Sequence, residues 1–574
     1  MLRLSELKLP LDHSAADLEA AILRRLKLPA TSLVGHTLVK RSIDARRRGA
    51  IQVVYCLDLE LTLPEKDQQR LLRRFAGDPH LRPTPDHTYH FVAQAPADSL
   101  RPVVIGAGPC GYFCALVLAQ MGYRPLLLER GRPVQQRTAD TFGFWRGERP
   151  FQSESNAQFG EGGAGTFSDG KLYSQISEPA PYARKVLEEL VAAGAHAEIL
   201  TKHRPHIGTF KLATVVRGLR ARIETLGGEV RFEQRVEGLD LDPSDRSVRG
   251  VLLADGQRLA ARQVVLAVGH SARDTFVWLD RLGVAMEPKP FAVGLRIEHP
   301  QSLIDTALWG DVAGHPQLGP AEYKLVYHGP DGRDVYSFCM CPGGLVVGAA
   351  SEADGVVTNG MSQHSRNERN ANSGIVVNVT LEDLRPWQQR PGDPLAGMAF
   401  QRHWERQAFM AGGGDHRAPA QFLGDFMAGR ESVEGDDRAA GGSAAEDLIK
   451  IVRPSYQPGV RLGRLDHCLP APMIEAIRGA LPHFAQKIRG YGMAGALLTG
   501  VETRTSSPLR IARQGETLQS LNTPGLFPAG EGAGYAGGIL SAAIDGIKVA
   551  EALAINPPLL PPPGVRGGSA CDPA

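Results

Sequence analysis

The sequence has almost no net charge and lacks long apolar runs. Its 574 residues carry 64 Lys and Arg against 62 Asp and Glu, so bulk electrostatics does not favour nucleic acid as the main ligand. No apolar run reaches the roughly 18 residues that span a bilayer, and the start of the chain lacks the features of a signal peptide. Seven cysteines in a chain of this length do not form a disulfide scaffold. The sequence therefore predicts a cytoplasmic protein with no membrane partner.

Glycine, in contrast, is plentiful, with 65 residues. The pattern G-x-G-x-x-G, which is typical of loops that bind dinucleotides, occurs four times. The four copies begin at Gly106, Gly160, Gly490 and Gly532. A copy holds a phosphate only where a strand precedes it and a helix follows, because the helix N-terminus must face the anion. We therefore judge each copy by its flanks.

The copy at 106–111 meets both conditions. A short buried strand, "PVVI", precedes it, and an apolar helical segment, "YFCALVLAQMGY", follows. Pro109 falls in the first helical turn, where a missing N–H costs little. Glu129 ends the next predicted strand about 20 residues further on, where an acidic side chain meets a ribose hydroxyl. This copy predicts a dinucleotide-binding turn.

The other three copies have different flanks. The copy at 490 follows a helix-like segment, so we interpret it as a helix end and turn. The copy at 532 has a strand, a glycine turn and a helix, but no second strand with a ribose acid follows, so it predicts a unit that caps a cofactor. The stretch 158–171, "QFGEGGAGTFSDGK", lies between polar segments and predicts a glycine-rich loop.

Three segments far apart in the chain carry a resemblance. They are "VVIGAGPCG…LLLERG" at 103–131, "LAARQVVLAVGHSARDTF" at 259–276 and "TPGLFPAGEGAGYAGGILSAAIDG" at 523–546. With these segments in this order, the chain resembles FAD-dependent oxidoreductases of the glutathione-reductase-like class. It is also similar to a family of FAD-dependent dehydrogenases of bacteria and plastids with a poorly defined role, through "QFGEGGAGTFSDGKL", "KPFAVGLRIEHPQSLID", "FCMCPGG" and "GVETRTSSPLRI".

The resemblance implies a noncovalently bound FAD, with NAD(P)H as one candidate electron donor. Glu129 would bind the adenosine ribose, with Arg130 beside the adenine and the backbone of Val236 at its edge. Glu531 stands where such proteins usually have an aspartate that binds the ribityl chain. The residues that the resemblance places at the cofactor are Gly106, Gly108, Pro109, Gly111, Glu129, Arg130, Val236, Gly269, Gly530, Glu531, Gly537, Gly538 and Ile539.

Two further parts of the cofactor site follow from the same resemblance. The helix that starts near Gly538 would direct its N-terminus at the flavin, where it would stabilise negative charge. Related FAD domains also send a glycine-rich loop back across the cofactor shortly after the ribose acid. On that basis Gly162, Gly163 and Thr166 would lie near the flavin; the alternative is a glycine-rich surface turn.

The chain departs from the disulfide reductases of that class. Cys110 and Cys114 share one face of the first predicted helix, which we expect to pack against the sheet, so we do not interpret them as a redox pair. No second complete fingerprint for NAD(P)H is present. A nicotinamide would therefore dock at the substrate face, or the substrate itself would supply the hydride.

Few residues stand out as catalytic candidates. Cys339 and Cys341 share one face of a predicted strand and are either a redox pair near a flavin or, as we favour, two small buried side chains. No second cysteine pair completes a zinc site, so we expect no metal. His270 follows the glycine turn near the cofactor. Arg504, with Arg296 and Lys171, is either a ligand for a substrate anion or structural.

The element pattern predicts an α/β fold: a Rossmann-like FAD-binding domain with an inserted, largely antiparallel α+β substrate domain and a small N-terminal α+β domain. We place the N-terminal domain at 1–97, the FAD-binding domain at 98–285 and 501–556, the substrate domain at 286–500 and a disordered tail at 557–574. The segment 428–447 resembles a surface loop.

The function predicted from these features is an FAD-dependent oxidoreductase acting on a small organic molecule. One alternative is an FAD-dependent enzyme that modifies RNA, suggested by the basic run "KRSIDARRRG" at 40–49. We favour a solvated strand end and loop for that run, so nucleic acid is not the expected partner. The remaining alternative is a noncatalytic flavin sensor.

Overall fold

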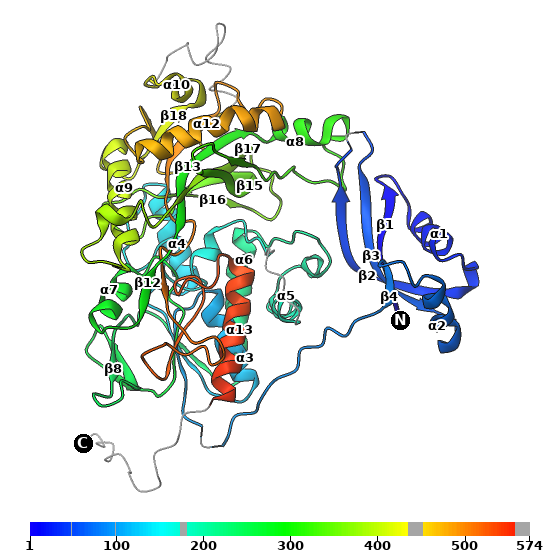
Figure 1. The fold of residues 1–574 in the computed structure, drawn as a ribbon, viewed down its shortest axis with the longest axis horizontal. Helices are drawn as coiled ribbons and strands as arrows, with labels where there is room; N and C mark the ends of the chain where they lie inside the picture. Colours follow the sequence, from blue (N-terminus) through cyan, green and yellow to red (C-terminus); the bar gives the residue numbers. More distant parts are fainter. Residues whose placement is uncertain (48, 98, 173–180, 434–451, 557–574) are drawn as a thin grey trace.

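The computed structural model describes residues 1–47, 49–97, 99–172, 181–433 and 452–556 (Figure 1). It is a mixed α/β structure with both parallel and antiparallel sheets. The tail at 557–574 and most of the segment predicted as a loop at 428–447 lie outside the described residues. No helix in the described part of the chain is long and apolar enough to cross a membrane.

The N-terminal unit is a four-stranded antiparallel sheet with two helices, shown in blue in Figure 1. Ser14 and Asp17 cap the first helix reciprocally. The basic run begins inside the second strand, which continues to Asp44, in keeping with a strand end followed by a turn. The elements are β1 (Leu2–Pro10), α1 (Ala15–Leu26), β2 (Leu33–Asp44), β3 (Gln52–Leu61), α2 (Glu65–Arg74) and β4 (Leu81–Pro83).

A five-stranded parallel sheet follows, in the order β22-β11-β5-β6-β7. Parallel neighbours need crossover connections, and here the crossovers carry helices. The strands are β5 (Val103–Ile105), β6 (Leu126–Leu128), β7 (Glu229–Arg231), β11 (Val264–Leu266) and β22 (Leu526–Pro528). The helices are α3 (Pro109–Gln120), α4 (Val134–Trp145), α5 (Tyr182–Ala192), α6 (Thr209–Thr225) and α13 (Ile539–Ile555).

Helices α3 and α13 lie side by side against this sheet although more than 400 residues separate them in the chain (Figure 1). Their contact is close because Gly546 of α13 has no side chain: a Cβ there would lie 2.2 Å from the carbonyl oxygen of Cys110 in α3. Both helices begin directly after a strand and a glycine turn, so both N-termini emerge at the carboxyl edge of the sheet. This edge is where ligands bind in open α/β sheets.

Two small sheets accompany the parallel sheet. An antiparallel sheet of three strands is followed in the chain by a helix that packs on it. A two-stranded antiparallel ribbon connects the parallel-sheet unit with the unit of the eight-stranded sheet, one strand in each direction of the chain. The elements are β8 (Val236–Leu241), β9 (Val248–Leu253), β10 (Arg258–Ala260), α7 (Arg273–Arg281), β12 (Met286–Pro288) and β21 (Leu509–Ile511).

The largest sheet has eight strands and is antiparallel except for the pair β18 and β19. Helices pack over it and enclose a separate apolar core (Figure 1). The strands are β13 (Phe291–Pro300), β14 (Val326–His328), β15 (Asp334–Gly348), β16 (Thr358–Ser362), β17 (Asn370–Val379), β18 (Ala418–Phe422), β19 (Val460–Leu462) and β20 (Leu497–Glu502). The helices are α8 (Gln301–Trp309), α9 (Ala396–Gly412), α10 (Leu423–Ala428) and α12 (Ala471–Lys487).

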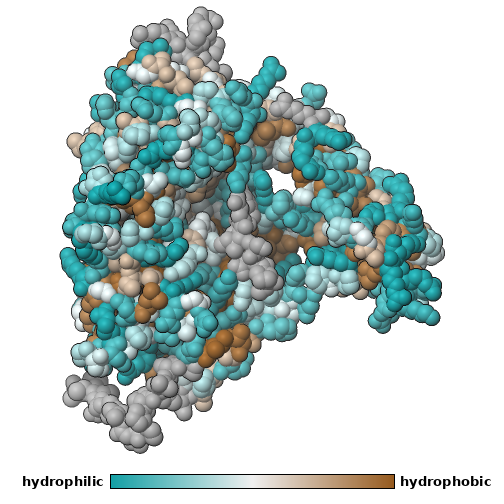
Figure 2. All heavy atoms as spheres, in the orientation of Figure 1, coloured by the Kyte–Doolittle hydropathy of each residue, from teal (hydrophilic) through white to brown (hydrophobic). Residues whose placement is uncertain are grey.

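The N-terminal unit contacts the body through β2. The backbone N–H of Arg41 donates to Thr201 O at 2.7 Å, and the N–H of His203 donates to Arg41 O at 3.0 Å. A second contact joins Gln317 to Leu11 O at 2.7 Å. Figure 2 shows openings between this unit and the body on the face that it presents. The N-terminal unit therefore touches the body along a short edge.

Candidate functional site

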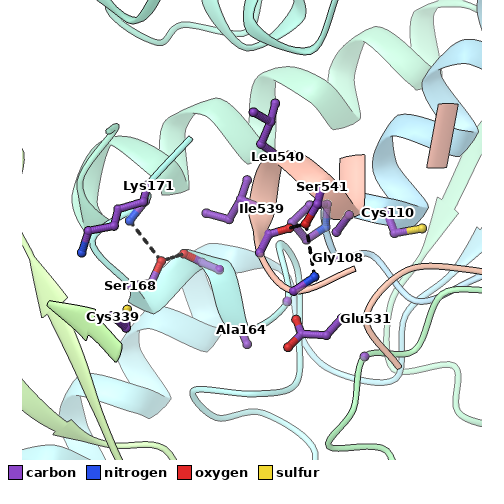
Figure 3. Close-up of a pocket in the computed structure, with 18 of the residues that line it drawn as sticks. Gly108, Cys110, Ala164, Ser168, Lys171, Cys339, Glu531, Ile539, Leu540 and Ser541 are labelled. Carbon is purple, nitrogen blue, oxygen red and sulfur yellow. Dashed lines mark hydrogen bonds between the residues drawn. The ribbon is translucent and has the colours of Figure 1, made fainter. Parts of the chain in front are cut away.

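A cavity of about 1460 Å³ lies between the N-terminal unit, the unit of the parallel sheet and the unit of the eight-stranded sheet. Ligand pockets in proteins usually measure about 300–1000 Å³, so this cavity has room for more than one small molecule. Its wall includes the glycine turn after β5, the start of α13, part of β15 and, from the N-terminal unit, Val39 and Lys40. Figure 3 shows Lys171 and Cys339 on one side of the cavity and the first residues of α13 facing it.

The turn between β5 and α3 forms one end of the cavity. A Cβ at Gly106, which has φ +103°, would lie 2.4 Å from the carbonyl oxygen of Ala267, and a Cβ at Gly111 would lie 1.9 Å from the carbonyl oxygen of Gly106. Gly108 and Pro109 line the cavity, and Gly108 is an N-cap without a side-chain bond to the helix. The first N–H groups of α3 thus remain for an anion. Gly111 packs behind the turn and is not part of the wall.

The stretch 158–171 lies directly across this turn. The N–H of Gly162 donates to Ala107 O at 2.8 Å, and a Cβ at Gly163 would lie 3.0 Å from the Cα of Gly108. The stretch contains one 3₁₀ turn, Ala164–Phe167, and no strand or long helix. The prediction of a glycine-rich loop is confirmed. Gly163 lines the cavity, whereas Gly162 and Thr166 are buried and are not among the lining residues.

Glu129 lies at the cavity wall, at the end of β6. Its carboxylate accepts three backbone N–H groups: Ala107 at 2.8 Å, Gly131 at 2.9 Å and Gly160 at 3.1 Å. A carboxylate has about four acceptor positions, so one remains for a hydroxyl group of a ligand. The same three bonds join both glycine loops to β6. Glu129 therefore holds this end of the cavity together.

Arg130 and Val236 also line this end. The guanidinium group of Arg130 pairs with Glu154 at 2.7 Å and with Asp274 at 2.8 Å. It also lies 4.2 Å from the centre of the Phe159 ring. These contacts fix a flat guanidinium group at the wall, which suits stacking against a planar base.

Glu531 and His270 meet further along the wall. The Nδ1 atom of His270 is 2.9 Å from a carboxylate oxygen of Glu531. The other ring nitrogen, Nε2, is buried and has no hydrogen-bond partner among the described residues. Buried polar groups are nearly always paired, so this orphaned nitrogen at the wall of a cavity indicates a ligand group. Gly269, the preceding residue, lines the cavity as well.

The start of α13 completes this part of the wall, which includes Gly537, Gly538 and Ile539. Gly538 is the N-cap and no side chain caps the helix. The positive end of the helix dipole therefore faces the cavity and favours negative charge there. Gly530 lies behind the wall, where a Cβ would be 2.8 Å from that of Cys110, and its N–H donates to Asp545 at 2.7 Å.

The opposite end of the cavity is built from side chains. Lys171 pairs with the buried Asp169 at 3.1 Å and donates to the carbonyl oxygen of Met340. Burial opposes the ionisation of Asp169, but Lys171 and Arg366 outweigh it and lower its pKa to about 2. Cys339 lines the cavity, and Cys341 is fully buried behind it. Both cysteines are free thiols.

Two arginines that the sequence offered as anion ligands are engaged by carboxylates. Arg296 has no exposed surface and forms two bonds to Glu502, at 2.6 and 2.7 Å. Arg504 lies at the cavity wall, but Glu405 holds its guanidinium group at 3.0 and 3.2 Å. This geometry therefore supports a structural role for both arginines. Neither carboxylate partner carried a signal in the sequence, because Glu is almost never expected to be fully buried.

Cys110 lies at the cavity wall at the start of α3, and Cys114 lies one turn further along the helix. Both are buried in α3, on a face that contacts α13 at Gly546. α3 is enclosed on nearly all sides, and the side chain of Cys110 lies against Gly530, just after β22 of the sheet. That this face packs on the sheet stays a prediction. Burial raises the pKa of both thiols. They are packing residues, as predicted.

Two family models match separate parts of the chain. A family model described as "FAD-dependent protein, C-terminal domain-like" matches residues 290–505, and a domain of unknown function matches residues 1–60. An uncharacterised protein of Clostridium beijerinckii is 42% identical over 560 residues, which cover 96% of this chain and 98% of the relative. The chain thus carries a domain of FAD-dependent proteins. It belongs to the family of this Clostridium protein.

Solved structures show only a distant likeness. CtdE in complex with FAD is 12% identical, with 80% of this chain and 85% of that chain covered and a TM-score of 0.30. A geranylgeranyl bacteriochlorophyll reductase-like protein from Thermoplasma acidophilum is 11% identical, with 79% and 78% covered and a TM-score of 0.32. Similarity at this level supports no conclusion about the site or the reaction.

Proposed function

We propose that this FAD-dependent protein is an oxidoreductase that moves a hydride between a small organic substrate, or NAD(P)H, and flavin N5. The observation that carries the proposal is one cavity with two parts. Two uncapped helix N-termini and the carboxylate of Glu129, which can accept a ribose hydroxyl, line the first part. Polar and sulfur-bearing side chains line the second. A dinucleotide cofactor fits the first part, and the second part leaves space for a substrate.

The residues present fit FAD at each point. The turn at Gly106 and Gly108 is too narrow for side chains, and it brings the N–H groups at the start of α3 to the cavity for a pyrophosphate. Glu129 has one acceptor position left for the adenosine ribose. The unpaired Nε2 of His270, held by Glu531, is available to a ribityl hydroxyl. These assignments extend those that the resemblance implied.

When bound, FAD supplies a two-electron acceptor and donor at its isoalloxazine ring. The protein's own part is to bind, orient and adjust charge. The N-terminus of α13 would stabilise negative charge beside it. Glu531 would keep His270 in one orientation by accepting its Nδ1–H, so that Nε2 always faces the cavity as an acceptor. The α/β unit would thus position the cofactor, while the antiparallel sheet would position the substrate.

The basic run at 40–49 does not support RNA as the substrate. Arg46 donates to Asp44 of its own hairpin at 2.6 and 2.8 Å, which offsets its charge. Arg47 is exposed, and residue 48 lies outside the described chain. A small molecule therefore remains the proposed substrate.

The test is to purify the chain and measure its visible spectrum. We expect a yellow protein whose flavin is released on denaturation, because no covalent link is proposed. Rapid mixing with NADH and with NADPH should then bleach the flavin if either is the donor. A colourless protein that fails to take up added FAD would overturn the proposal. A yellow protein inert to all donors would favour the flavin sensor.

A further inference from the structure

The segment Cys339-Met340-Cys341 departs from regular strand geometry. The pairing of β15 with β17 shifts register between Phe338 and Cys341, which marks a bulge. Cys339 has φ +43°, in the left-handed region that residues with side chains rarely adopt. Such conformations persist where the surrounding structure enforces them, and they cluster at functional sites.

The bulge places the Cys341 thiol against the backbone of Cys339. In a regular strand, with a rise of about 3.3 Å per residue, residues two apart lie near the upper limit of the roughly 4.4–6.8 Å that a disulfide spans between Cα atoms. Here the Cys341 thiol donates to the carbonyl oxygen of Cys339 at 3.3 Å. The Cys341 sulfur therefore lies directly beside residue 339.

Two cations, each of them paired with a carboxylate, lie beside the two cysteines. The Nζ atom of Lys171 is 3.9 Å from the Cys341 sulfur, and Arg296 donates to the carbonyl oxygen of Cys339 at 3.3 Å. The hydrogen bond with Cys341 lowers the pKa of Cys339 against the effect of burial, and both cations lower it further. The same hydrogen bond and burial raise the pKa of Cys341. Cys339 is thus the more acidic of the two thiols.

The two sulfurs differ in access. Cys339 lines the cavity that also contains the start of α13, whereas Cys341 has no exposed surface (Figure 3). A reachable thiolate with a buried partner is the arrangement that thiol–disulfide chemistry requires, because the thiolate attacks and the partner then closes the bond. In the pair Cys110 and Cys114, burial raises the pKa of both thiols, so neither is a ready thiolate.

We propose that Cys339 and Cys341 form a redox-active dithiol that exchanges two electrons with the FAD of the same cavity. In the oxidising direction the S–H bond of Cys341 breaks and an S–S bond forms between the two cysteines. The proton of that thiol and the two electrons pass to the oxidised isoalloxazine ring, and the reverse reaction restores the dithiol. This inference rests on the proposed FAD function, which it extends by a second redox centre.

The first experiment tests whether the disulfide forms. The experiment itself does not require bound FAD. The full-length protein is equilibrated with oxidised or reduced dithiothreitol, denatured, alkylated and analysed by mass spectrometry. We expect the peptide that contains residues 339–341 to escape alkylation after oxidation, while Cys110 and Cys114 remain alkylated. Two free thiols in that peptide under oxidising conditions would overturn the proposal.

The second experiment counts electrons in the FAD-loaded protein by anaerobic titration with dithionite after oxidation. We expect the wild type to take up twice as many reducing equivalents per flavin as Cys339→Ser or Cys341→Ser, because disulfide and flavin each accept two electrons. Cys56→Ser, at a distant site in the N-terminal unit, should behave like the wild type.

The outcomes of the second experiment separate the two proposals. Equal uptake by the wild type and both serine variants, with FAD bound in all of them, would reject the dithiol and leave the proposed function standing. Failure of every variant to bind FAD would reject the proposed function, and with it the electron exchange. In Cys341→Ser, a pH-dependent absorbance at wavelengths beyond the flavin band that is missing from Cys339→Ser would place the thiolate beside the flavin.

Discussion

The two ends of the cavity are built in different ways. The end at the parallel sheet is made of backbone: two glycine loops, two helix N-termini and one carboxylate that accepts only backbone N–H groups. The end at the antiparallel sheet is made of side chains that come from distant segments, such as Lys171, Cys339 and the buried Arg296. Substitutions at the first end should therefore act through shape, and those at the second end through charge.

The largest effect should come from a methyl group in the glycine turn. In Gly111→Ala the new Cβ would lie 1.9 Å from the carbonyl oxygen of Gly106, which belongs to the backbone of the same turn. Relief requires α3 to move away from the turn, so we expect loss of bound FAD and a free energy of unfolding lower by about 4 kcal/mol or more. Flavin content and chemical denaturation measure both.

Gly515→Ala is the matched control for this shape effect. Gly515 is exposed, and a Cβ there would meet nothing within 4 Å. This variant should keep its flavin and its stability. Full flavin content in Gly111→Ala would show that the turn tolerates side chains, and the contrast between the two ends would fail.

Charge should dominate at the other end. Glu502→Gln removes the partner of a guanidinium group that has no exposed surface, with bonds of 2.6 and 2.7 Å. Breaking a buried pair costs about 3–5 kcal/mol, because an uncompensated charge stays in the interior. Urea denaturation should show this loss. Glu148→Gln, which removes an exposed pair with Arg146, should cost about 1 kcal/mol or less; equal costs for the two variants would contradict the argument.

The same contrast explains what could be predicted from the sequence. The turn at Gly106, the strand and helix around it and the loop at 158–171 were predictable because steric demands on glycine act within a few neighbouring residues. The buried partners Glu405, Glu502 and Asp169 were not predictable, since a carboxylate is expected at the surface unless its cation is known, and that cation lies far away in the chain.

Periodicity failed where a helix is buried all round. In α3 every residue from Cys110 to Ala119 is buried, so no polar stripe marks which face meets the sheet and which meets α13. The contribution of Val39 and Lys40 to the cavity wall also had no local signal, because it depends on how β2 docks against residues 201–203. The bulge at Cys339 arises from strand pairing, which a single strand does not reveal.

Acid should next weaken the core of the antiparallel sheet, where His299 lies in β13. Burial lowers the pKa of His299 to about 4, although its bond to Tyr491 O opposes this shift. Between about pH 6.5 and 4 the unfolded chain binds a proton that the folded chain does not, so stability falls as the pH falls through this window, by up to about 3 kcal/mol. Urea denaturation at pH 7.5 and 5 measures this slope.

The slope is assigned by substitution. His299→Gln keeps a donor for Tyr491 O but does not titrate, so the loss of stability between pH 7.5 and 5 should shrink. His328→Gln, on an exposed side chain, should leave the slope of the wild type unchanged. A slope that is the same in His299→Gln and the wild type would assign the acid sensitivity to other groups.

The smallest effect should come from the pair of Glu531 and His270 at the backbone end. Glu531→Gln keeps the size of the side chain but weakens its bond with Nδ1 of His270, now 2.9 Å. A hydrogen bond to a charged group contributes about 2 kcal/mol, so we expect FAD to bind roughly 30-fold more weakly, with the fold intact. Flavin fluorescence quenching on titration of the apoprotein gives the dissociation constant.

His270→Ala should weaken FAD binding to a similar degree. The double variant should bind FAD little more weakly than either single variant, because Glu531 acts by orienting the ring nitrogen that His270 presents to the ligand. If the losses of FAD affinity in the two single variants add up in the double variant, Glu531 contacts the cofactor directly, as an aspartate would. Its extra methylene would then only extend the carboxylate towards the cofactor.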